Sequence, residues 1–314
     1  MEKNYQYLDR EHTLRLKGLS IILVLISHIS VFLLPLKIAR LATPLGGIGA
    51  SMFLFLSGYG LAQSSKRGLS GFWKKRFFTV VLPYLLIWLV LLPISAFRYT
   101  GALDFAFDLL AVSPKAEYLW YIGYQIFWYA VYYFIKKMGL VEWANLVLLF
   151  GISVLTFGLL PGIYAEKAFA FSLGVLFAHA PRFAAVFKLP WVSAIAFCVG
   201  AASLAAKQTS LVRSFSFLPF NAAEALIKMG FMLSFVGAFY YITRLVPWVL
   251  PKFISNLSYE IYLSHSVGAV LFYMISGKST LLAFFVFLAV SAILTAALWA
   301  FKRFVTPKLQ GVKK

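Results

Sequence analysis

Acidic residues are scarce in this chain of 314 residues. Asp and Glu number 10 against 29 Lys and Arg, and charged residues of both signs make up only 12% of the sequence. Water-soluble domains carry a charge on about a quarter of their residues. The low charged fraction excludes an ordinary soluble protein, because too few charged side chains are present to cover a water-exposed surface.

Cysteine is almost absent. The one cysteine, Cys198, lies in an apolar run. This excludes an intrachain disulfide and a Cys-x-x-Cys motif. We expect the Cys198 side chain to be a small core residue.

Long polar segments are missing as well. The longest polar gaps are residues 98–117 and 207–221, and no A-x-A cleavage motif follows the first apolar run. We therefore expect one integral membrane domain over residues 1–314, without an attached soluble domain and without a cleaved signal peptide.

Apolar residues, in contrast, are abundant and form long runs. Hydrophobic residues make up 62% of the chain and aromatic residues 18%, and the mean hydropathy is +0.86. A helix crosses about 30 Å of hydrocarbon with roughly 20 apolar residues. We predict ten such spans, at about 14–34, 45–63, 77–97, 118–135, 143–160, 164–180, 190–206, 222–243, 254–276 and 280–301. Transmembrane strands alternate in polarity, whereas these runs are apolar on every side, so we predict an all-α, polytopic transmembrane helical bundle.

The basic residues predict the orientation of the bundle. With both termini in the cytoplasm, 20 of the 29 Lys and Arg face the cytoplasm, 8 face the opposite side and Lys228 lies within a span. This asymmetry follows the positive-inside rule, so we predict N-in and C-in. The net charge of +19 is then mainly a topology signal, with anionic membrane lipids as partners. Nucleic acid is not expected, because the aromatic residues lie in the apolar runs and not among the basic residues.

Two of the four histidines lie deep in apolar runs. His28 is eleven residues past Lys17, and His265 is eleven past Ile254, which places each about 16 Å from the cytoplasmic end of its helix, near the bilayer midplane. Two interpretations stay open for each: an imidazole that bonds a neighbouring helix, or a general base in a buried polar cavity. His12 and His179 are not expected to take part in chemistry.

One acid–base pair also lies in an apolar run. Glu224 and Lys228 are four residues apart, a spacing that lets each neutralise the other on one face of a helix. The alternative is a polar substrate-binding site in the outer half of the bundle. Both interpretations stay open.

Four segments, in order along the chain, resemble one family. Lys17-x10-His28 resembles the R-x10-H signature in the first helix of the acyltransferase family 3 membrane proteins, which include bacterial polysaccharide O-acetyltransferases. Three further segments resemble the second helix of that family, the basic run before its Pro-Tyr pair, and its late S-Y-x-I-Y-L-x-H motif: G-A-S-M-F-L-F-L-S-G-Y (49–59), F-W-K-K-R-F-F-T-V-V-L-P-Y (72–84) and L-S-Y-E-I-Y-L-S-H (257–265).

Two positions depart from the family pattern. Lys17 stands where the family usually has Arg, which keeps the charge but loses the planar, bidentate fork. The family's R-x-x-R before the third helix is here Arg76-Phe77-Phe78-Thr79, so the second arginine is missing. Both departures concern the side that binds the donor.

The resemblance implies an enzyme. A membrane O-acyltransferase of this kind transfers an acetyl group from cytoplasmic acetyl-CoA, its co-substrate, to a hydroxyl of a cell-envelope polysaccharide or lipid-linked sugar in the bacterial inner or plasma membrane. It implies His28 as the general base, with His265 as a second catalytic candidate, and no metal.

The positions of the residues, together with the resemblance, assign residues to the two substrates. We expect Lys17, Arg15, Lys75 and Arg76 to bind the phosphates of the donor, and Ser57 and Tyr59 to bind its remaining part. Tight helix packing is an equal alternative for the small-residue stretch around Gly58. Tyr259 is assigned to substrate binding with Glu224 and Lys228, the alternative being a polar residue at a helix start.

A transporter or a flippase of a sugar-linked solute is the competing function. Buried His, Glu and Lys are also what a proton relay needs. The helices broken by Gly or Pro and the internal two-fold symmetry of many secondary transporters are not evident in the sequence. We therefore favour the acyltransferase.

Overall fold

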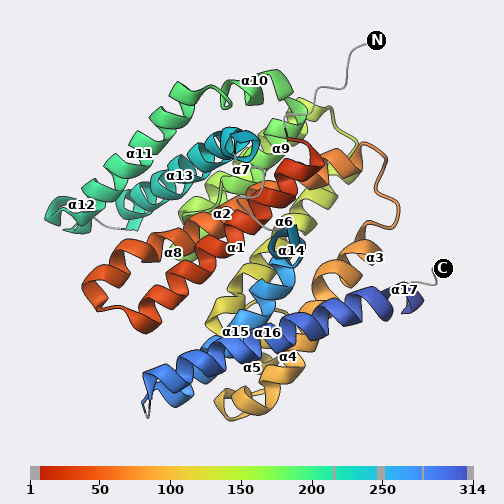
Figure 1. Cartoon of the computed structure of the whole chain (residues 1–314). Helices are drawn as coiled ribbons and strands as arrows, with labels where there is room; N and C mark the ends of the chain where they lie inside the picture. The colour runs from red at the N-terminus through yellow and green to blue at the C-terminus, as the bar shows by residue number, and fades with distance from the viewer. Residues whose placement is uncertain (1–7, 215–216, 246–251, 278, 310–314) are drawn as a thin grey trace. The chain divides into compact units, whose positions relative to one another are not determined.

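The computed structural model describes residues 8–214, 217–245, 252–277 and 279–309. These residues form helices and turns, and no β-strand occurs among them (Figure 1). The prediction of an all-α fold is confirmed.

The helices follow one another with short connections. In chain order they are α1 (Arg10–Leu33), α2 (Leu36–Ser65), α3 (Phe72–Arg76), the π-helix η1 (Phe77–Val81), α4 (Leu82–Ser95), the 3₁₀-helix η2 (Ala96–Arg98), α5 (Ala102–Leu109), the 3₁₀-helix η3 (Glu117–Leu119), α6 (Trp120–Lys137), α7 (Glu142–Leu159), α8 (Gly162–Ala165), α9 (Ala170–His179), α10 (Pro181–Val186), α11 (Pro190–Gln208), α12 (Ser210–Ser214), α13 (Phe217–Leu245), α14 (Lys252–Asn256), α15 (Ser258–Ser276), α16 (Thr280–Phe304) and α17 (Thr306–Leu309).

Several of these helices can cross a membrane. Within the described part of the chain, seven helical segments are long and apolar enough: Arg10–Leu33, Lys37–Ser65, Phe72–Ser95, Glu142–Leu159, Pro190–Gln208, Phe220–Ile242 and Thr280–Phe304. The segment Phe72–Ser95 consists of α3, η1 and α4 in succession. The seven segments coincide with seven of the predicted spans, as expected for a multi-pass membrane protein. The predicted spans 164–180 and 254–276 are each formed by two helices, and the span 118–135 falls on η3 and α6. The number of spans and the orientation stay predictions.

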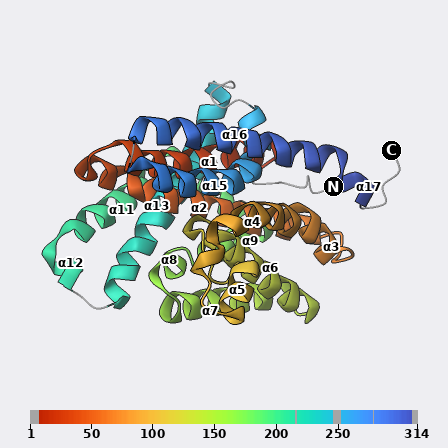
Figure 2. The same cartoon turned by 90° about the horizontal axis from the view of Figure 1, so that it is seen from below.

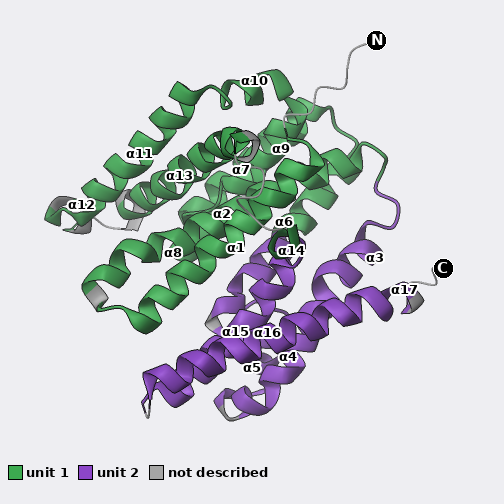
Figure 3. Cartoon of the chain, in the orientation of Figure 1, with its two compact units in different colours: residues 1–68, 128–255 green, residues 69–127, 256–314 purple. Residues whose placement is uncertain are grey.

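The chain divides into two compact units (Figure 3). Unit 1 contains residues 1–68 and 128–255, and unit 2 contains residues 69–127 and 256–314. Each unit is built from two separate stretches of sequence and is described by itself below. The expected single domain over residues 1–314 stays a prediction.

Unit 1 is held together by close helix pairs. α1 packs on α2, α2 packs on α9, and α11 packs on α13; Figures 1 and 2 both show α11 and α13 side by side. A Cβ at Gly58 would meet the backbone carbonyl oxygen of Phe171, and one at Gly174 would meet that of Phe55. Glycine at these two positions lets α2 and α9 approach backbone to backbone. Gly58 therefore packs against a neighbouring helix, as one of the two interpretations of this stretch expected.

The prediction that Cys198 is a core residue is wrong. Its side chain is exposed, and the buried residues of α11 are Ser193 and Gly200. Apart from Gln208 at its end, the exposed residues of α11 are themselves apolar and include Trp191 and Ile195. An apolar residue in a membrane helix does not have to be in the protein core, because lipid solvates it equally well.

Unit 2 is built around α15. This helix packs on α16 and on α4, and the hydroxyl groups of Ser264 and Thr295 are 2.8 Å apart between α15 and α16. Glu260 is buried and accepts a hydrogen bond from Lys302 Nζ at 2.5 Å. Polar contacts of this kind fix the rotation of one membrane helix against its neighbour.

Candidate functional site

His28 lies in the second half of α1 and is half-buried. Lys17 lies in the same helix, eleven residues earlier, and is exposed. Eleven residues are about three full turns, so the two side chains leave the same face of α1 and are about 16 Å apart along its axis. Next to His28, Ser27 Oγ donates to the backbone carbonyl of Thr43 at 2.9 Å, which fixes α1 against α2.

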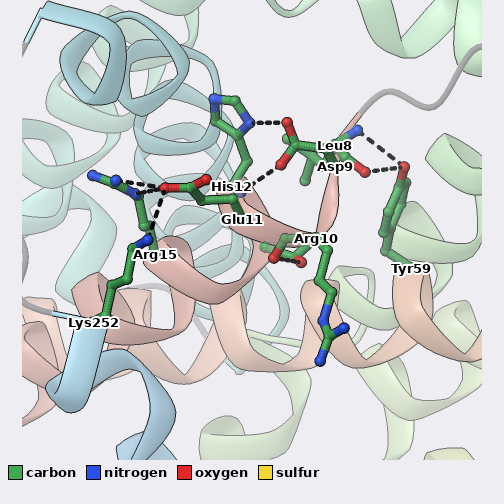
Figure 4. Close-up of polar contacts among 9 residues, drawn as sticks. Leu8, Asp9, Arg10, Glu11, His12, Arg15, Tyr59 and Lys252 are labelled. Atoms are coloured by element: carbon green, nitrogen blue, oxygen red, sulfur yellow. Dashed lines mark hydrogen bonds and ion pairs between the residues drawn. The ribbon is translucent and has the colours of Figure 1, made fainter. Parts of the chain in front are cut away.

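The start of α1 carries a polar cluster (Figure 4). Asp9 accepts the backbone N–H of His12 at 2.8 Å and caps the helix, which satisfies a donor that the first turn leaves open. Arg15 is buried, and its Nη2 donates to Glu11 Oε1 at 2.6 Å; Lys252 Nζ is 4.0 Å from the same oxygen. Arg15 thus reaches a carboxylate on its own helix, and its role in binding the donor stays a prediction.

Tyr59 anchors the segment that precedes α1 (Figure 4). Its hydroxyl accepts the backbone N–H of Leu8 at 3.0 Å and donates to the carbonyl of the same residue at 3.0 Å. One buried side chain therefore satisfies both the backbone N–H and the backbone carbonyl of Leu8. Two residues earlier in α2, Ser57 Oγ accepts a hydrogen bond from the hydroxyl of Tyr129 at 3.4 Å. The contacts of Ser57 and Tyr59 with the donor stay predictions.

The pair of Glu224 and Lys228 belongs to a larger group in unit 1. Lys228 Nζ is 2.6 Å from Glu224 Oε2 and 3.3 Å from Glu166 Oε2. Lys207 pairs with the other oxygen of Glu224, and Lys167 pairs with Glu166. We call these five residues the charged cluster. The sequence indicated the pair on α13 but not its three partners, because they come from other segments and only the fold brings them together.

The charged cluster is largely buried and has an excess of positive charge. Lys167 and Lys228 are 1% and 4% exposed, and three lysines face two glutamates. Burying an ion costs several kcal/mol unless it is paired, so each member depends on its partners. Asn221, one turn before Glu224 on α13, is also buried, and its Nδ2 has no hydrogen-bond partner among the described residues.

His265 is fully buried in unit 2. Its Nδ1 contacts the backbone carbonyl oxygen of Tyr262. A carbonyl oxygen only accepts, so Nδ1 carries the proton, and in the neutral ring Nε2 is the basic nitrogen. The His265 ring lies 5.9 Å from the ring of Tyr118 and 5.3 Å from that of Tyr262, between centroids.

The remaining predicted residues of unit 2 lie near α3, η1 and the start of α15. The hydroxyl of Tyr259 donates to the carbonyl of Val80 at 2.8 Å. Lys75 is exposed on α3, while Arg76 is half-buried with its guanidinium 5.2 Å from the ring centre of Phe72. Lys75 and Arg76 thus belong to one unit, and Arg15 and Lys17 to the other. The joint donor site expected from these four residues stays a prediction.

Comparison with known proteins identifies the family. The family model described as Acyltransferase domain, Acyl_transf_3, matches residues 14–300. No curated protein and no solved structure matches the chain. The match covers most of the chain and includes residues of both units, and it confirms the resemblance seen in the four sequence segments. The chain therefore belongs to the acyltransferase family 3, and it is a membrane acyltransferase.

Proposed function

We propose that this protein transfers an acetyl group from cytoplasmic acetyl-CoA to a hydroxyl of a cell-envelope polysaccharide or lipid-linked sugar in a bacterial inner or plasma membrane. The observation that carries the proposal is the pair of Lys17 and His28 on one face of α1, inside the family match over residues 14–300.

The proposed reaction needs a base and a site for phosphate. His28 accepts the proton of the sugar hydroxyl while the hydroxyl oxygen attacks the thioester carbonyl, and a positioned histidine contributes about 10² to 10⁴ in rate. The new C–O bond replaces the C–S bond, and the CoA thiolate leaves and takes up a proton. Lys17, about three turns from His28, attracts the phosphates of CoA.

A measurement of acetyl esters in envelope glycans tests the proposal. Cells that express the intact protein are compared with cells that express His28→Ala at the same membrane level. We expect ester in the first and none in the second. His179→Gln serves as the matched histidine control, because His179 lies at the end of α9 beside Glu142, with its Nε2 3.4 Å from Oε2 of that residue, and outside the proposed reaction.

The result also decides between the enzyme and the transporter. Ester that persists in the His28→Ala cells removes this histidine from the mechanism and leaves two alternatives: transport of a sugar-linked solute, or a base supplied by His265. Repeating the comparison with His265→Gln then shows whether the second buried histidine supplies the base. Loss of ester only with His265→Gln assigns the chemistry to unit 2.

A further inference from the structure

A cavity of 430 Å³ lies within unit 2. Its walls come from α4, from the segment between η2 and α6, and from the second half of α15. This volume falls within the range of about 300 to 1,000 Å³ that is typical of small-molecule sites. None of the residues predicted from the sequence lines the cavity.

Aromatic side chains form a large part of the wall. Trp88, Tyr118 and Tyr273 line the cavity, and the hydroxyl groups of the two tyrosines are 3.4 Å apart. Such rings offer flat apolar faces together with polar edges. A sugar ring has the matching surface, because its C–H groups present an apolar face and its hydroxyl groups surround it.

A buried carboxylate makes this wall rigid. Asp108 is 3% exposed. It accepts hydrogen bonds from Trp88 Nε1 at 2.9 Å, from the backbone N–H of Lys115 at 2.7 Å, and from the hydroxyl of Tyr99. The Trp88 ring and the loop that carries Lys115 are thereby fixed before any ligand binds, which lowers the entropic cost of binding. These hydrogen-bond donors also compensate the negative charge of Asp108.

One arginine, Arg98, lines the cavity. Arg98 is exposed, and its Nη1 donates to the backbone carbonyl of Lys115 at 3.3 Å. Among the residues that the structure describes, no carboxylate forms a salt bridge with Arg98. Lys115 differs, because its Nζ is 2.6 Å from Asp104 Oδ1, and this hydrogen bond holds the pKa of Asp104 below its usual range. Arg98 therefore has a charge that is available to an anionic group.

The cavity also lies close to the second catalytic candidate. Tyr118 lines the cavity with one side, its backbone carbonyl accepts the hydroxyl of Tyr262, and its ring packs near His265. Tyr118 thus lines the cavity and also lies beside the buried histidine. The connection places the cavity next to a group able to exchange protons.

We propose that this cavity binds an anionic sugar, with the sugar ring against Trp88 and Tyr118 and its carboxylate or phosphate on Arg98. The assignment of this sugar as the acetyl acceptor rests on the proposed function. The anionic group has two sources, the carboxylate of an acidic sugar in a polysaccharide or the phosphate of a lipid-linked sugar. A guanidinium binds either as a bidentate partner.

The test is a ligand-observed NMR titration of the full-length protein in detergent. The probes are glucuronate, glucose 1-phosphate and glucose. We expect one anionic probe to bind at least about tenfold more tightly than glucose, since a hydrogen bond to a charged group contributes about 1.5 to 3 kcal/mol. The tighter of the two anions identifies the source. Equal binding of all three probes by the intact protein overturns the proposal.

Two variants show whether Arg98 is responsible. Arg98→Gln should reduce the preference for the anion to less than about twofold, while Arg303→Gln, an exposed arginine of α16 in the same unit, should leave it unchanged. Arg98 is exposed, so its replacement does not disturb the core. A preference that survives Arg98→Gln contradicts the assignment.

Binding and acetyl transfer can fail separately. If His28→Ala abolishes ester but the preference does not depend on Arg98, the cavity assignment is wrong and the proposed function stands. If binding depends on Arg98 but no ester is ever formed, the proposed acetyl transfer is wrong and the cavity remains a sugar site.

Discussion

At the scale of a single residue, Tyr59 has two proposed roles, one in structure and one in donor binding. In unit 1 its hydroxyl bonds both backbone groups of Leu8, whereas the family resemblance places it at the acetyl donor. Tyr59→Phe removes both hydrogen bonds and should lower the free energy of unfolding by about 1 to 3 kcal/mol. Thermal unfolding of the purified protein and the KM for acetyl-CoA separate the roles. A lower unfolding midpoint with an unchanged KM would show that Tyr59 has a structural role. A raised KM with an unchanged midpoint would contradict the structural role and place Tyr59 at the donor.

The charged cluster allows a prediction about which of two variants is the less stable. The wild-type cluster has one excess positive charge; Glu224→Gln raises the excess to two, while Lys228→Met leaves two balanced pairs, Lys207 with Glu224 and Lys167 with Glu166. Uncompensated buried charge costs about 3 to 5 kcal/mol. Glu224→Gln should therefore destabilise the protein more than Lys228→Met.

Thermal unfolding of the two variants at the same pH and detergent concentration checks this order. Adding Lys228→Met to Glu224→Gln should recover part of the loss, because it removes one excess charge. If Lys228→Met alone lowers the unfolding midpoint more than Glu224→Gln does, the excess positive charge does not determine the stability of the cluster.

Functional residues within a single helix could be predicted from the sequence more easily than residues that the fold brings together from separate segments. The spacing of Lys17 and His28 is a property of α1 alone, so it could be predicted from the helical period. Glu166, Lys167 and Lys207 join Glu224 only through the packing of separate segments. The wall of the unit 2 cavity was missed for the same reason, since Trp88 and Asp108 are twenty residues apart in sequence.

At the scale of the helices, hydropathy predicted where each apolar run lies but not where it is interrupted. The run at 164–180 is broken after Ala165, where Glu166 and Lys167 of the charged cluster lie, before α9 resumes at Ala170. The segment Phe72–Ser95 includes the π-helix η1, whose i→i+5 bonds leave no signal in hydropathy. Such breaks depend on tertiary contacts, which composition does not report.

Two glycines on α2 test the packing of α2 on α9. A Cβ at Gly58 would meet the Phe171 carbonyl oxygen, whereas one at Gly60 would meet nothing within 4 Å. Gly60→Ala should be neutral or stabilise the helix by up to about 1 kcal/mol. Gly58→Ala should instead destabilise unit 1, because the two backbones must move apart. Midpoints of thermal unfolding measure both, and equal midpoints would mean that α2 and α9 are not in close contact.

At the scale of the whole molecule, the charge distribution predicts which side each loop faces. Ser70 and Ser113 are exposed and flank the span Phe72–Ser95. With N-in topology, Ser70 lies in the cytoplasm and Ser113 outside, where the cavity of unit 2 would open to an envelope sugar. Ser70→Cys and Ser113→Cys, each in a Cys198→Ala background, form a matched pair. In intact cells a membrane-impermeant maleimide should label only Ser113→Cys. Labelling of only Ser70→Cys would invert the topology and place the cavity on the side of the acetyl donor, and labelling of both would show that Phe72–Ser95 does not cross the membrane.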